Sequence, residues 1–413
     1  MTSTERHEAR YQRRKAKREA KRRARSEACG SFEDIFSYAN LYRSGHICSR
    51  GVGWKSSTQS YIANIVTNTE KTRQELLSGK YKGRGFIEFD ICERGKMRHI
   101  RSVHISERVV QRTLCDKAII PVFQPALIYD NGASMKNKGI TFALNRVNCH
   151  LQRHYRKHGT EGYVLLFDFS KYFDTANHEP VQRELLRRVC DDRVRALANQ
   201  CLGAFGPVGY GLGSQISQIA AIMLPNRLDH MIKEELGIKG YARYMDDGYL
   251  IHHNKAHLEH CLTRIQALCD ELHITLNPKK TTIKRLSDGF DFLKVRFRLT
   301  NTGKVVRRMS YDSVKTMHRK LKKFRKWHEH GRYVKIRGRS VRKEFSLADI
   351  CRAYANWRSH MARGHNYWQV NRMDAFFHRL FGFHPCDKEA WRTVFERKEG
   401  ITCTELETML QAV

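Results

Sequence analysis

Two stretches decide how this sequence is read: Tyr163-Val-Leu-Leu-Phe-Asp168 and, further along the chain, Tyr244-Met-Asp-Asp247. The first is an apolar run that ends in a carboxylate, which predicts a buried strand with Asp168 at its C-terminal end. The two Asp residues of the second stretch lie between the short segments 241–244 and 248–252. These segments predict a hairpin with the Asp pair in its turn.

The acidic pair has two interpretations. Asp suits turn geometry, so an Asp pair in a turn is often only a turn. Two adjacent carboxylates also repel each other unless a cation neutralises them, and a third on a neighbouring strand completes a set of oxygen ligands for Mg²⁺. Asp168, Asp246 and Asp247 are therefore candidate metal ligands. Two such ions activate a hydroxyl and stabilise a leaving group in nucleotide transfer.

The composition indicates a polyanionic partner. The 413 residues include 76 Lys and Arg against 42 Asp and Glu, a formal charge of +34, and 41% are hydrophobic. That length and apolar content predict two or three folded domains. Nucleic acid is the first candidate partner and anionic lipid the second. No apolar run approaches the roughly 20 residues of a membrane span.

The N-terminus and the cysteines indicate a cytoplasmic protein. No apolar segment follows the polar N-terminus, so no secretory signal is expected. The twelve cysteines include no Cys-x-x-Cys pair, which gives no support to a zinc ribbon or finger. We expect reduced, mostly buried thiols.

Two segments concentrate the basic charge. Residues 10–25 contain ten Lys or Arg and one acid, and they predict either a helix that firms up on a phosphate backbone or a solvated tail. Residues 304–343 contain sixteen Lys or Arg and two acids, and we expect a basic helical domain there with a boundary near Asn301.

Between these segments the pattern predicts mixed structure. Alternation over 86–91 and 97–103 predicts a hairpin. Ser106 is the expected N-cap of a helix over 107–120 that Pro121 ends. A further helix is expected over 217–235, and 289–297 alternates like a strand.

Several ordered motifs resemble those of reverse transcriptases. Phe167-Asp-Phe-Ser-Lys-Tyr-Phe-Asp174 resembles the first palm motif, Leu212-Gly-Ser-Gln-Ile-Ser-Gln218 the second and Tyr244-Met-Asp-Asp247 the third. Leu276-Asn-Pro-Lys-Lys-Thr281 is similar to the fourth motif and 289–297 to the primer grip. The resemblance extends upstream through Arg108-Val-Val-Gln111 and Asn131-Gly-Ala-Ser134, and covers about residues 85–300.

The resemblance implies a fold and a domain order. The expected class is α+β, a right-hand polymerase whose palm is an antiparallel sheet and whose thumb is helical. The expected parts are a basic N-terminal arm (1–30), fingers (31–160), a palm (161–300), a basic helical thumb (301–385) and a short C-terminal appendix (386–413).

The resemblance also implies roles for single residues. Asp168, Asp246 and Asp247 would bind two Mg²⁺ ions, with Mn²⁺ as an alternative. Lys280, or Lys279 beside it, would protonate pyrophosphate. Phe173 falls at the steric gate that favours deoxynucleotides, although core packing is its other interpretation.

Further residues would contact the nucleotide, template and primer. Arg98 would hold the incoming triphosphate, with Lys96 and Arg101 as weaker candidates. Gly213, Ser217 and Gln218 would border the nascent base pair. The remaining candidates would contact primer and template: Phe292, Leu293, Lys294, Lys320, Lys323 and Arg325.

The resemblance leaves the biological role open. The second motif ends in Ser217-Gln218, where many retroviral and intron enzymes have Ser-Pro. A similar ending occurs in diversity-generating retroelement enzymes and in bacterial lineages linked to phage defence. The implied partners are an RNA template, a DNA or RNA primer and deoxynucleotides, with a dedicated noncoding RNA and antiviral defence as the first expectation.

Two alternatives remain. One is a diversity-generating retroelement enzyme, and the other is a noncatalytic RNA-binding scaffold with a polymerase-like fold. The acidic triad argues against the scaffold, because clustered carboxylates cost stability unless a metal is bound.

Overall fold

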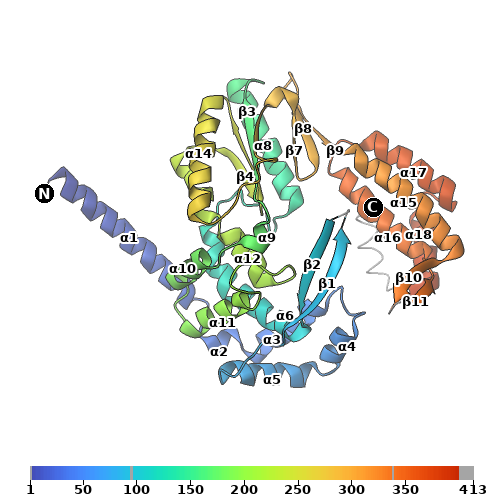
Figure 1. Cartoon of the computed structure of the whole chain (residues 1–413), viewed down its shortest axis with the longest axis horizontal. Coiled ribbons are helices and arrows are strands. Elements are labelled where there is room, and N and C mark those ends of the chain that lie inside the picture. Colours follow the sequence, from blue (N-terminus) through green and yellow to red (C-terminus); the bar gives the residue numbers. More distant parts are fainter. Residues whose placement is uncertain (1, 94–95, 337–338, 400–413) are drawn as a thin grey trace. The chain divides into compact units, whose positions relative to one another are not determined.

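The computed structural model describes residues 2–93, 96–336 and 339–399 (Figure 1). It divides into two compact units. The first consists of the residues up to His150 together with Tyr163–Ile283, and the second of Leu151–Gly162 together with the residues from Lys284 onward. The further subdivision into fingers and palm remains a prediction.

The first unit begins with helices and one hairpin. The helices are α1 (Ser3–Glu27), α2 (Phe32–Ile35), α3 (Tyr38–Ser49), α4 (Ser56–Ala63) and α5 (Ile65–Leu77). The predicted hairpin is confirmed as β1 (Phe86–Glu93) and β2 (Lys96–Val103), which pair antiparallel. The next elements are α6 (Ile105–Leu114), the π-helix η1 (Cys115–Ile119), α7 (Ile120–Phe123) and the short η2 (Gln124–Ala126).

The start of α6 differs from the sequence expectation. Its N-cap is His104, whose ring accepts a hydrogen bond from the Ser106 N–H, so the prediction that Ser106 caps the helix was wrong. Pro121 does not end the helical run either. It lies at the second position of α7, which directly follows the π-helix η1, so the helical run continues through it.

A central antiparallel sheet is the frame of the first unit. Its strands are β3 (Tyr163–Asp168), β4 (Gly240–Tyr244), β5 (Asp247–His252) and β6 (Thr282–Arg285), in the order β4-β5-β3-β6. The predicted strand and hairpin are thereby confirmed. α14 (Lys255–Glu271) packs on β3 and β5, and α8 (Ile140–His158) precedes the sheet in the chain.

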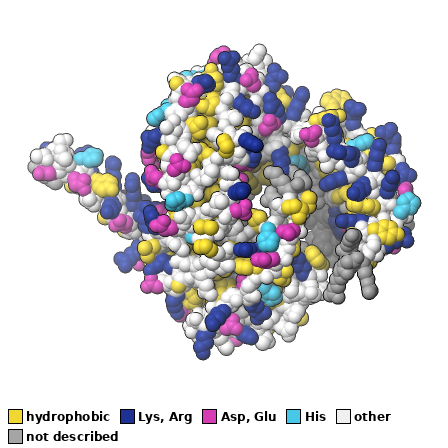
Figure 2. Space-filling model, viewed as in Figure 1, with side chains coloured by type: hydrophobic (Ala, Val, Ile, Leu, Met, Phe, Trp, Pro, Cys, Tyr) yellow, Lys and Arg dark blue, Asp and Glu magenta, His cyan; other side chains and the backbone are white. Residues whose placement is uncertain are grey.

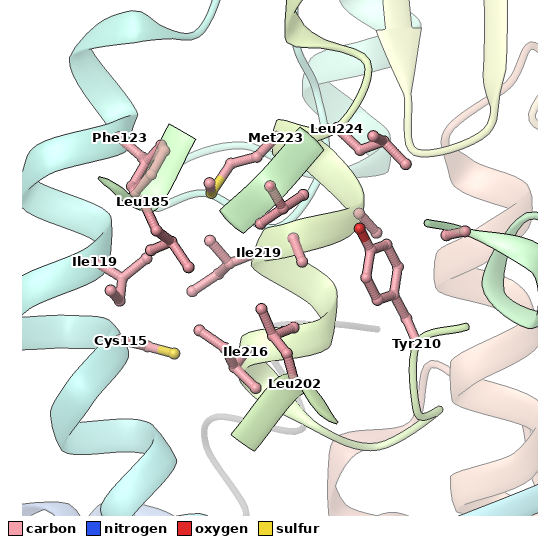
Figure 3. Close-up of a cluster of buried hydrophobic side chains, with 14 of the residues drawn as sticks. Cys115, Ile119, Phe123, Leu185, Leu202, Tyr210, Ile216, Ile219, Met223 and Leu224 are labelled. Atoms are coloured by element: carbon pink, nitrogen blue, oxygen red, sulfur yellow. The ribbon is translucent and has the colours of Figure 1, made fainter. Parts of the chain in front are cut away.

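Short helices connect β3 to β4: α9 (Tyr172–Thr175), α10 (Glu179–Arg188), α11 (Asp192–Gly203), α12 (Gln215–Met223), α13 (Asn226–His230) and the π-helix η3 (Met231–Glu235). The single helix expected over 217–235 was wrong. Pro225 has no N–H to donate, and it forms the N-cap of α13 instead of continuing α12. Figure 3 draws the buried cluster beneath these helices, including Leu185 of α10, Phe123 of α7 and Met223 of α12.

The second unit combines small sheets with helices. η4 (Leu286–Asp288) is followed by the antiparallel sheet β7 (Phe290–Phe292), β8 (Val295–Leu299) and β9 (Val305–Met309). The helices are α15 (Tyr311–His330), α16 (Leu347–Ala362), α17 (Tyr367–Phe381) and α18 (Lys388–Glu399), and β10 (Arg332–Ile336) pairs with β11 (Arg339–Lys343).

The basic segment 304–343 is therefore not purely helical, because β9, β10 and β11 lie within it together with α15. Across the described part of the chain, helices accompany antiparallel sheets, which confirms the α+β class. Within the same residues, no helix has both the length and the apolar character needed to cross a membrane.

Candidate active site

The register of the central sheet brings the predicted carboxylates together. β3 and β5 pair antiparallel so that Asp168 lies directly opposite Asp247. The Phe169 N–H donates to the Asp246 carbonyl over 3.2 Å, which ties the end of β3 to the turn between β4 and β5. Asp168 is buried, with 5% of its surface exposed. Two segments far apart in the sequence thus place three carboxylates at one end of the sheet.

The turn that carries Asp246 is held in a specific shape. Met245 has φ 54°, a left-handed conformation that is unfavourable for a residue with a side chain. The Arg243 guanidinium donates to the Met245 carbonyl over 2.7 Å and so holds the turn from beneath. At the next strand, a Cβ on Gly248 would approach the Phe167 ring to 2.2 Å, so only glycine fits after Asp247.

Arg243 is itself fixed by a buried ion pair. It is fully buried, and its Nε and Nη2 donate to the two carboxylate oxygens of Asp229 over 2.8 and 2.6 Å. The Tyr241 hydroxyl donates to Asp229 over 2.6 Å, and Arg243 also reaches the Ile222 carbonyl. A bidentate pair with these additional hydrogen bonds compensates both buried charges. Sequence reasoning missed this support, although a charged residue within the apolar strand 240–244 was its signal.

The fourth motif places two more side chains on Asp168. The Lys280 Nζ donates to one carboxylate oxygen over 2.8 Å, and the Asn277 amide donates to the other over 3.2 Å. The Asn277 N–H also donates to the Asp168 carbonyl over 2.7 Å, which attaches the segment to the strand. Of the two lysines considered, Lys280 reaches the carboxylates, whereas the Lys279 N–H is bonded to the Asn277 side chain. Asn277 was quoted in the motif without a role.

The three carboxylates perturb each other. Burial, the hydrogen bond with Asp168 and the charges of Asp246 and Asp168 together raise the pKa of Asp247 to about 7. Burial and the Asp168 charge also raise the pKa of Asp246. Burial would lower the pKa of Lys280, but its hydrogen bond to Asp168 and the neighbouring carboxylates raise it. Lys280 alone therefore does not neutralise the negative charge of the three carboxylates.

The donor set fits divalent cations, although the site is not a preformed cage. Carboxylate oxygens are the ligands that hard divalent ions prefer. Among the described residues, no three His, Cys, Asp or Glu side chains stand ready to hold a metal ion. Lys280 and Asn277 each hold an oxygen of Asp168, so a cation at this residue competes with both contacts.

Phe173 lies on α9, five residues after Asp168 in the sequence. Its side chain is partly buried and packs on the main core. Its carbonyl accepts the Tyr210 N–H over 2.6 Å, so the glycine-rich loop between α11 and α12 (residues 204–214) packs directly on α9. Gly209 has φ 88°, and a Cβ there would approach the Asp174 carbonyl oxygen to 2.8 Å. Glycine is therefore required for the loop to support Phe173 so closely.

A polar cavity of about 420 Å³ adjoins the second motif. Gly213 and Gln218 line it, together with Arg108 and Arg112 from α6, one helical turn apart. Ser217 is buried, and its hydroxyl has no hydrogen-bond partner within the described residues. The structure thus brings Gly213 and Gln218 together. Sequence reasoning gave the two arginines no role, although their i, i+4 spacing was a signal.

Of the three candidate triphosphate-binding residues on β2, the structure describes the side chain of Arg101 only. Arg101 is engaged, because it pairs with Glu88 at 3.0 Å and donates to the Phe205 carbonyl over 2.9 Å. The backbones of Arg98 and Lys96 belong to β2, opposite Ile91 and Glu93. The side chains of Arg98 and Lys96 lie outside the described part of the chain, so their role stays a prediction.

The primer and template candidates belong to the second unit. Phe292 is buried, and the neighbouring turn residues Leu293 and Lys294 both have positive φ, at 49° and 65°. The segment 289–297, expected as one strand, is a hairpin.

Three candidates share α15. Lys320 is exposed, the Lys323 Nζ lies 4.8 Å from the centre of the Trp327 ring, and Arg325 pairs with Glu329 at 2.8 Å. Their contact with nucleic acid remains a prediction.

Comparison with known proteins shows similarity to polymerases. The family model described as reverse transcriptase (RNA-dependent DNA polymerase) matches residues 82–297, which is more than half of the chain. Protein YkfC of Escherichia coli (strain K12) is 25% identical over 275 residues, covering 56% of this chain and 71% of that protein.

Two solved structures are also similar. Telomerase from Candida albicans, solved in complex with a fragment of telomeric RNA, is 11% identical, with a TM-score of 0.44 over 87% of this chain and 70% of that chain. Apo telomerase from Candida tropicalis is 14% identical, with a TM-score of 0.41 over 57% and 59%. The family match spans every residue of the carboxylate cluster described above, and the chain belongs to the reverse transcriptase (RNA-dependent DNA polymerase) family.

Proposed function

We propose that this right-hand polymerase extends a primer on an RNA template, and that the reaction takes place at Asp168, Asp246 and Asp247. The observation that carries the proposal is the register of Asp168 opposite Asp247 in a chain of this family. These carboxylates would hold two Mg²⁺ ions, or Mn²⁺ in their place. Such ions supply activation of the primer 3′-hydroxyl and charge stabilisation of the departing pyrophosphate.

Lys280 is proposed to deliver a proton to the pyrophosphate. The primer 3′-hydroxyl releases its proton to water, and its oxygen forms a bond to the α-phosphorus while the bond from that phosphorus to the bridging oxygen breaks. The Lys280 ammonium then protonates the leaving pyrophosphate oxygen. Its raised pKa keeps it protonated until that step, and its contact with Asp168 keeps it beside the carboxylates.

Phe173 is proposed to select deoxynucleotides. The loop before α12 packs on the backbone of α9 at Phe173 and Asp174, which fixes the chain that carries the aromatic ring. A ring held in this position would clash with a ribose 2′-hydroxyl. The variant Phe173→Ala is expected to incorporate ribonucleotides, measured as the ratio of ribonucleotide to deoxynucleotide incorporation on one template. An unchanged ratio would assign Phe173 to core packing.

The central test removes two of the three carboxylates. In the double variant Asp246→Asn/Asp247→Asn, deoxynucleotide incorporation should fall by about a thousandfold or more, since several kcal/mol of transition-state stabilisation are lost. RNA binding should remain. The matched control is Asp270→Asn/Asp288→Asn, which alters two exposed aspartates outside the cluster. Retained incorporation in the first variant would contradict the proposed site.

We further propose that the enzyme acts in the cytoplasm in antiviral defence, with a dedicated noncoding RNA. The Ser217-Gln218 ending of the second motif and the basic α1 support this role. Cells that carry the gene with its flanking sequence should resist phage, and Asp246→Asn/Asp247→Asn should abolish resistance. Resistance in that variant would favour the noncatalytic scaffold. A template repeat with a matching variable repeat nearby would favour a diversity-generating retroelement.

A further inference from the structure

A concave basic surface lies in the first unit at the opposite end of α12 from the second motif. Ser217 and Gln218 lie in the first turn of α12, and its last residue, Met223, lines a separate cavity of about 650 Å³. Six helical steps separate Ser217 from Met223, or about 9 Å. None of the candidate catalytic or nucleotide-binding residues lines this cavity.

Eight of the nineteen residues that line the cavity are Lys or Arg. α1 contributes Arg18, Lys21, Arg22 and Arg25. α10 contributes Arg183, Arg187 and Arg188, and α13 contributes Arg227. These eight residues define what we call the basic groove. Only two acids, Glu184 and Glu234, line the same cavity.

The two helices that supply seven of the eight groove cations, α1 and α10, are anchored. Ser26, near the end of α1, is buried, and its hydroxyl accepts the Cys190 N–H over 2.8 Å. α1 also contacts α7 and α10. Leu185 holds α10 in the buried cluster of Figure 3. The groove is therefore a packed surface, while the N-terminal half of α1 is exposed (Figures 1 and 2).

The positive charge of the groove is incompletely neutralised. Within the described chain, Arg18, Lys21 and Arg25 form no ion pair. Arg187 and Arg188 share the single carboxylate of Glu184, at 2.7 and 2.6 Å. Burial, followed by the charges of Arg187 and Arg188, lowers the pKa of Arg22. The repulsion between these like charges decreases when a polyanion binds.

The groove chemistry favours phosphodiesters. Seven of the eight cations are Arg, whose planar guanidinium binds phosphate oxygens in a bidentate manner. A membrane surface fits less well, because Tyr11 is the only large exposed hydrophobic residue of α1. The 25 residues of α1 extend about 37 Å, enough to follow roughly ten phosphates of one strand.

We propose that the basic groove is a second nucleic-acid site, separate from the active site, that grips the phosphate backbone of a folded RNA. The inference rests on the proposed function in one respect, since an RNA-templated polymerase must retain an RNA. The groove reads no bases. It anchors an RNA helix through its backbone and leaves the cavity at the second motif free for the template strand.

The test neutralises three groove arginines of α1. The variant is Arg18→Gln/Arg22→Gln/Arg25→Gln, and the matched control is Lys71→Gln/Lys239→Gln/Lys255→Gln, three exposed lysines elsewhere in the first unit. Binding of a fluorescent RNA stem-loop is measured by anisotropy over a range of salt concentrations. The groove variant should bind at least about tenfold more weakly, with a log–log salt slope smaller by about 2 to 3. The control variant should bind like the wild type.

A second readout separates this inference from the proposed function. Extension of a short primer–template that is too small to reach the groove should be equal in the wild type and the groove variant. A wild type that cannot extend this primer would refute the proposed function. The RNA-binding measurement would still show whether the groove binds RNA.

Three outcomes would overturn the groove proposal. The first is unchanged RNA binding in the variant, and the second is an equal loss of RNA binding in the lysine control. The third is a wild type that binds anionic vesicles and a variant that loses this binding but keeps RNA binding. The remaining arm of the binding experiment uses a DNA stem-loop of the same sequence. Weaker DNA than RNA binding by the wild type would support RNA as the ligand, and tighter DNA binding would contradict it.

Discussion

The carboxylate cluster and the basic groove are two charged regions of one unit, built in opposite ways. Asp168 and Asp247 are placed by strand register, with Asp168 buried and Asp247 partly buried, whereas most of the groove cations project from helix faces toward solvent. Backbone pairing fixes the position of the carboxylates. Long, flexible side chains can adapt to the shape of a nucleic acid. The comparison shows that chemistry needs a fixed geometry, whereas backbone binding needs only charge density on a firm support.

The largest expected effect comes from breaking the ion pair beneath the catalytic turn. Asp229→Ala leaves the fully buried Arg243 without its partner, which should cost about 3–5 kcal/mol of unfolding free energy. Denaturant unfolding measures this loss. A loss below about 1 kcal/mol would show that the pair is not structurally coupled to the core.

A double variant separates folding from positioning. In Asp229→Leu/Arg243→Met no buried charge is left unpaired, so most of the stability should return. The Met245 carbonyl still lacks its donor, so kcat should stay low while KM for the nucleotide changes little. Recovery of both stability and kcat would contradict a positioning role for Arg243.

The next effect concerns the single lysine within the cluster. Lys280→Ala should lower kcat by about a hundredfold, a typical loss for a general acid. Lys280→Arg keeps the positive charge beside Asp168 but donates a proton poorly, so it should restore stability and not kcat. Single-turnover extension measures the chemical step. Full activity in Lys280→Arg would reduce the role of Lys280 to charge balance.

A smaller effect concerns the stability of the metal-free protein. The folded pKa of Asp247, about 7, lies above the ordinary value of 3.8, so the carboxyl contributes most stability at low pH. That contribution is lost as the pH rises through about 7. Asp247→Asn removes the repulsion and should raise stability by ~1 kcal/mol at pH 8 in EDTA, with little gain at pH 5. An equal gain at both pH values would contradict the repulsion.

The smallest effect is expected in the groove. Arg18→Gln and Arg25→Gln remove exposed side chains, so each should change the unfolding free energy by less than about 0.5 kcal/mol. Thermal unfolding without nucleic acid measures this. A marked loss of stability would show that these residues hold α1 in place, and the groove would then differ less from the carboxylate cluster than we infer.

The local pattern predicted several elements well. The apolar run ending at Asp168 is strand β3, and the segments around Asp246 form the hairpin β4–β5. These predictions succeeded because alternating or continuous apolar side chains bury a strand face whatever surrounds it. The helix over 217–235 failed because the apolar pattern continues through Pro225, where the backbone cannot.

The candidate site was predicted only in part. The positions of Asp168, Asp246, Asp247 and Lys280 follow from motif order, but the sequence did not indicate that Asn277 holds one oxygen of Asp168. Arg243 and Asp229 are fourteen residues apart, and no spacing rule pairs them. The sequence indicated the basic arm through its run of Lys and Arg. It did not indicate that the arm lines one cavity together with α10.

By itself, the sequence determined β3, the hairpins β1–β2 and β4–β5, the ordered motifs and the excess of positive charge, because each depends on neighbours within one segment. Only the tertiary structure decided that Asp168 faces Asp247, that a buried arginine supports the turn between β4 and β5, and that α1 and α10 form one groove. Those contacts join residues far apart in the chain. Their geometry depends on how strands pair and helices pack, which local preference does not specify.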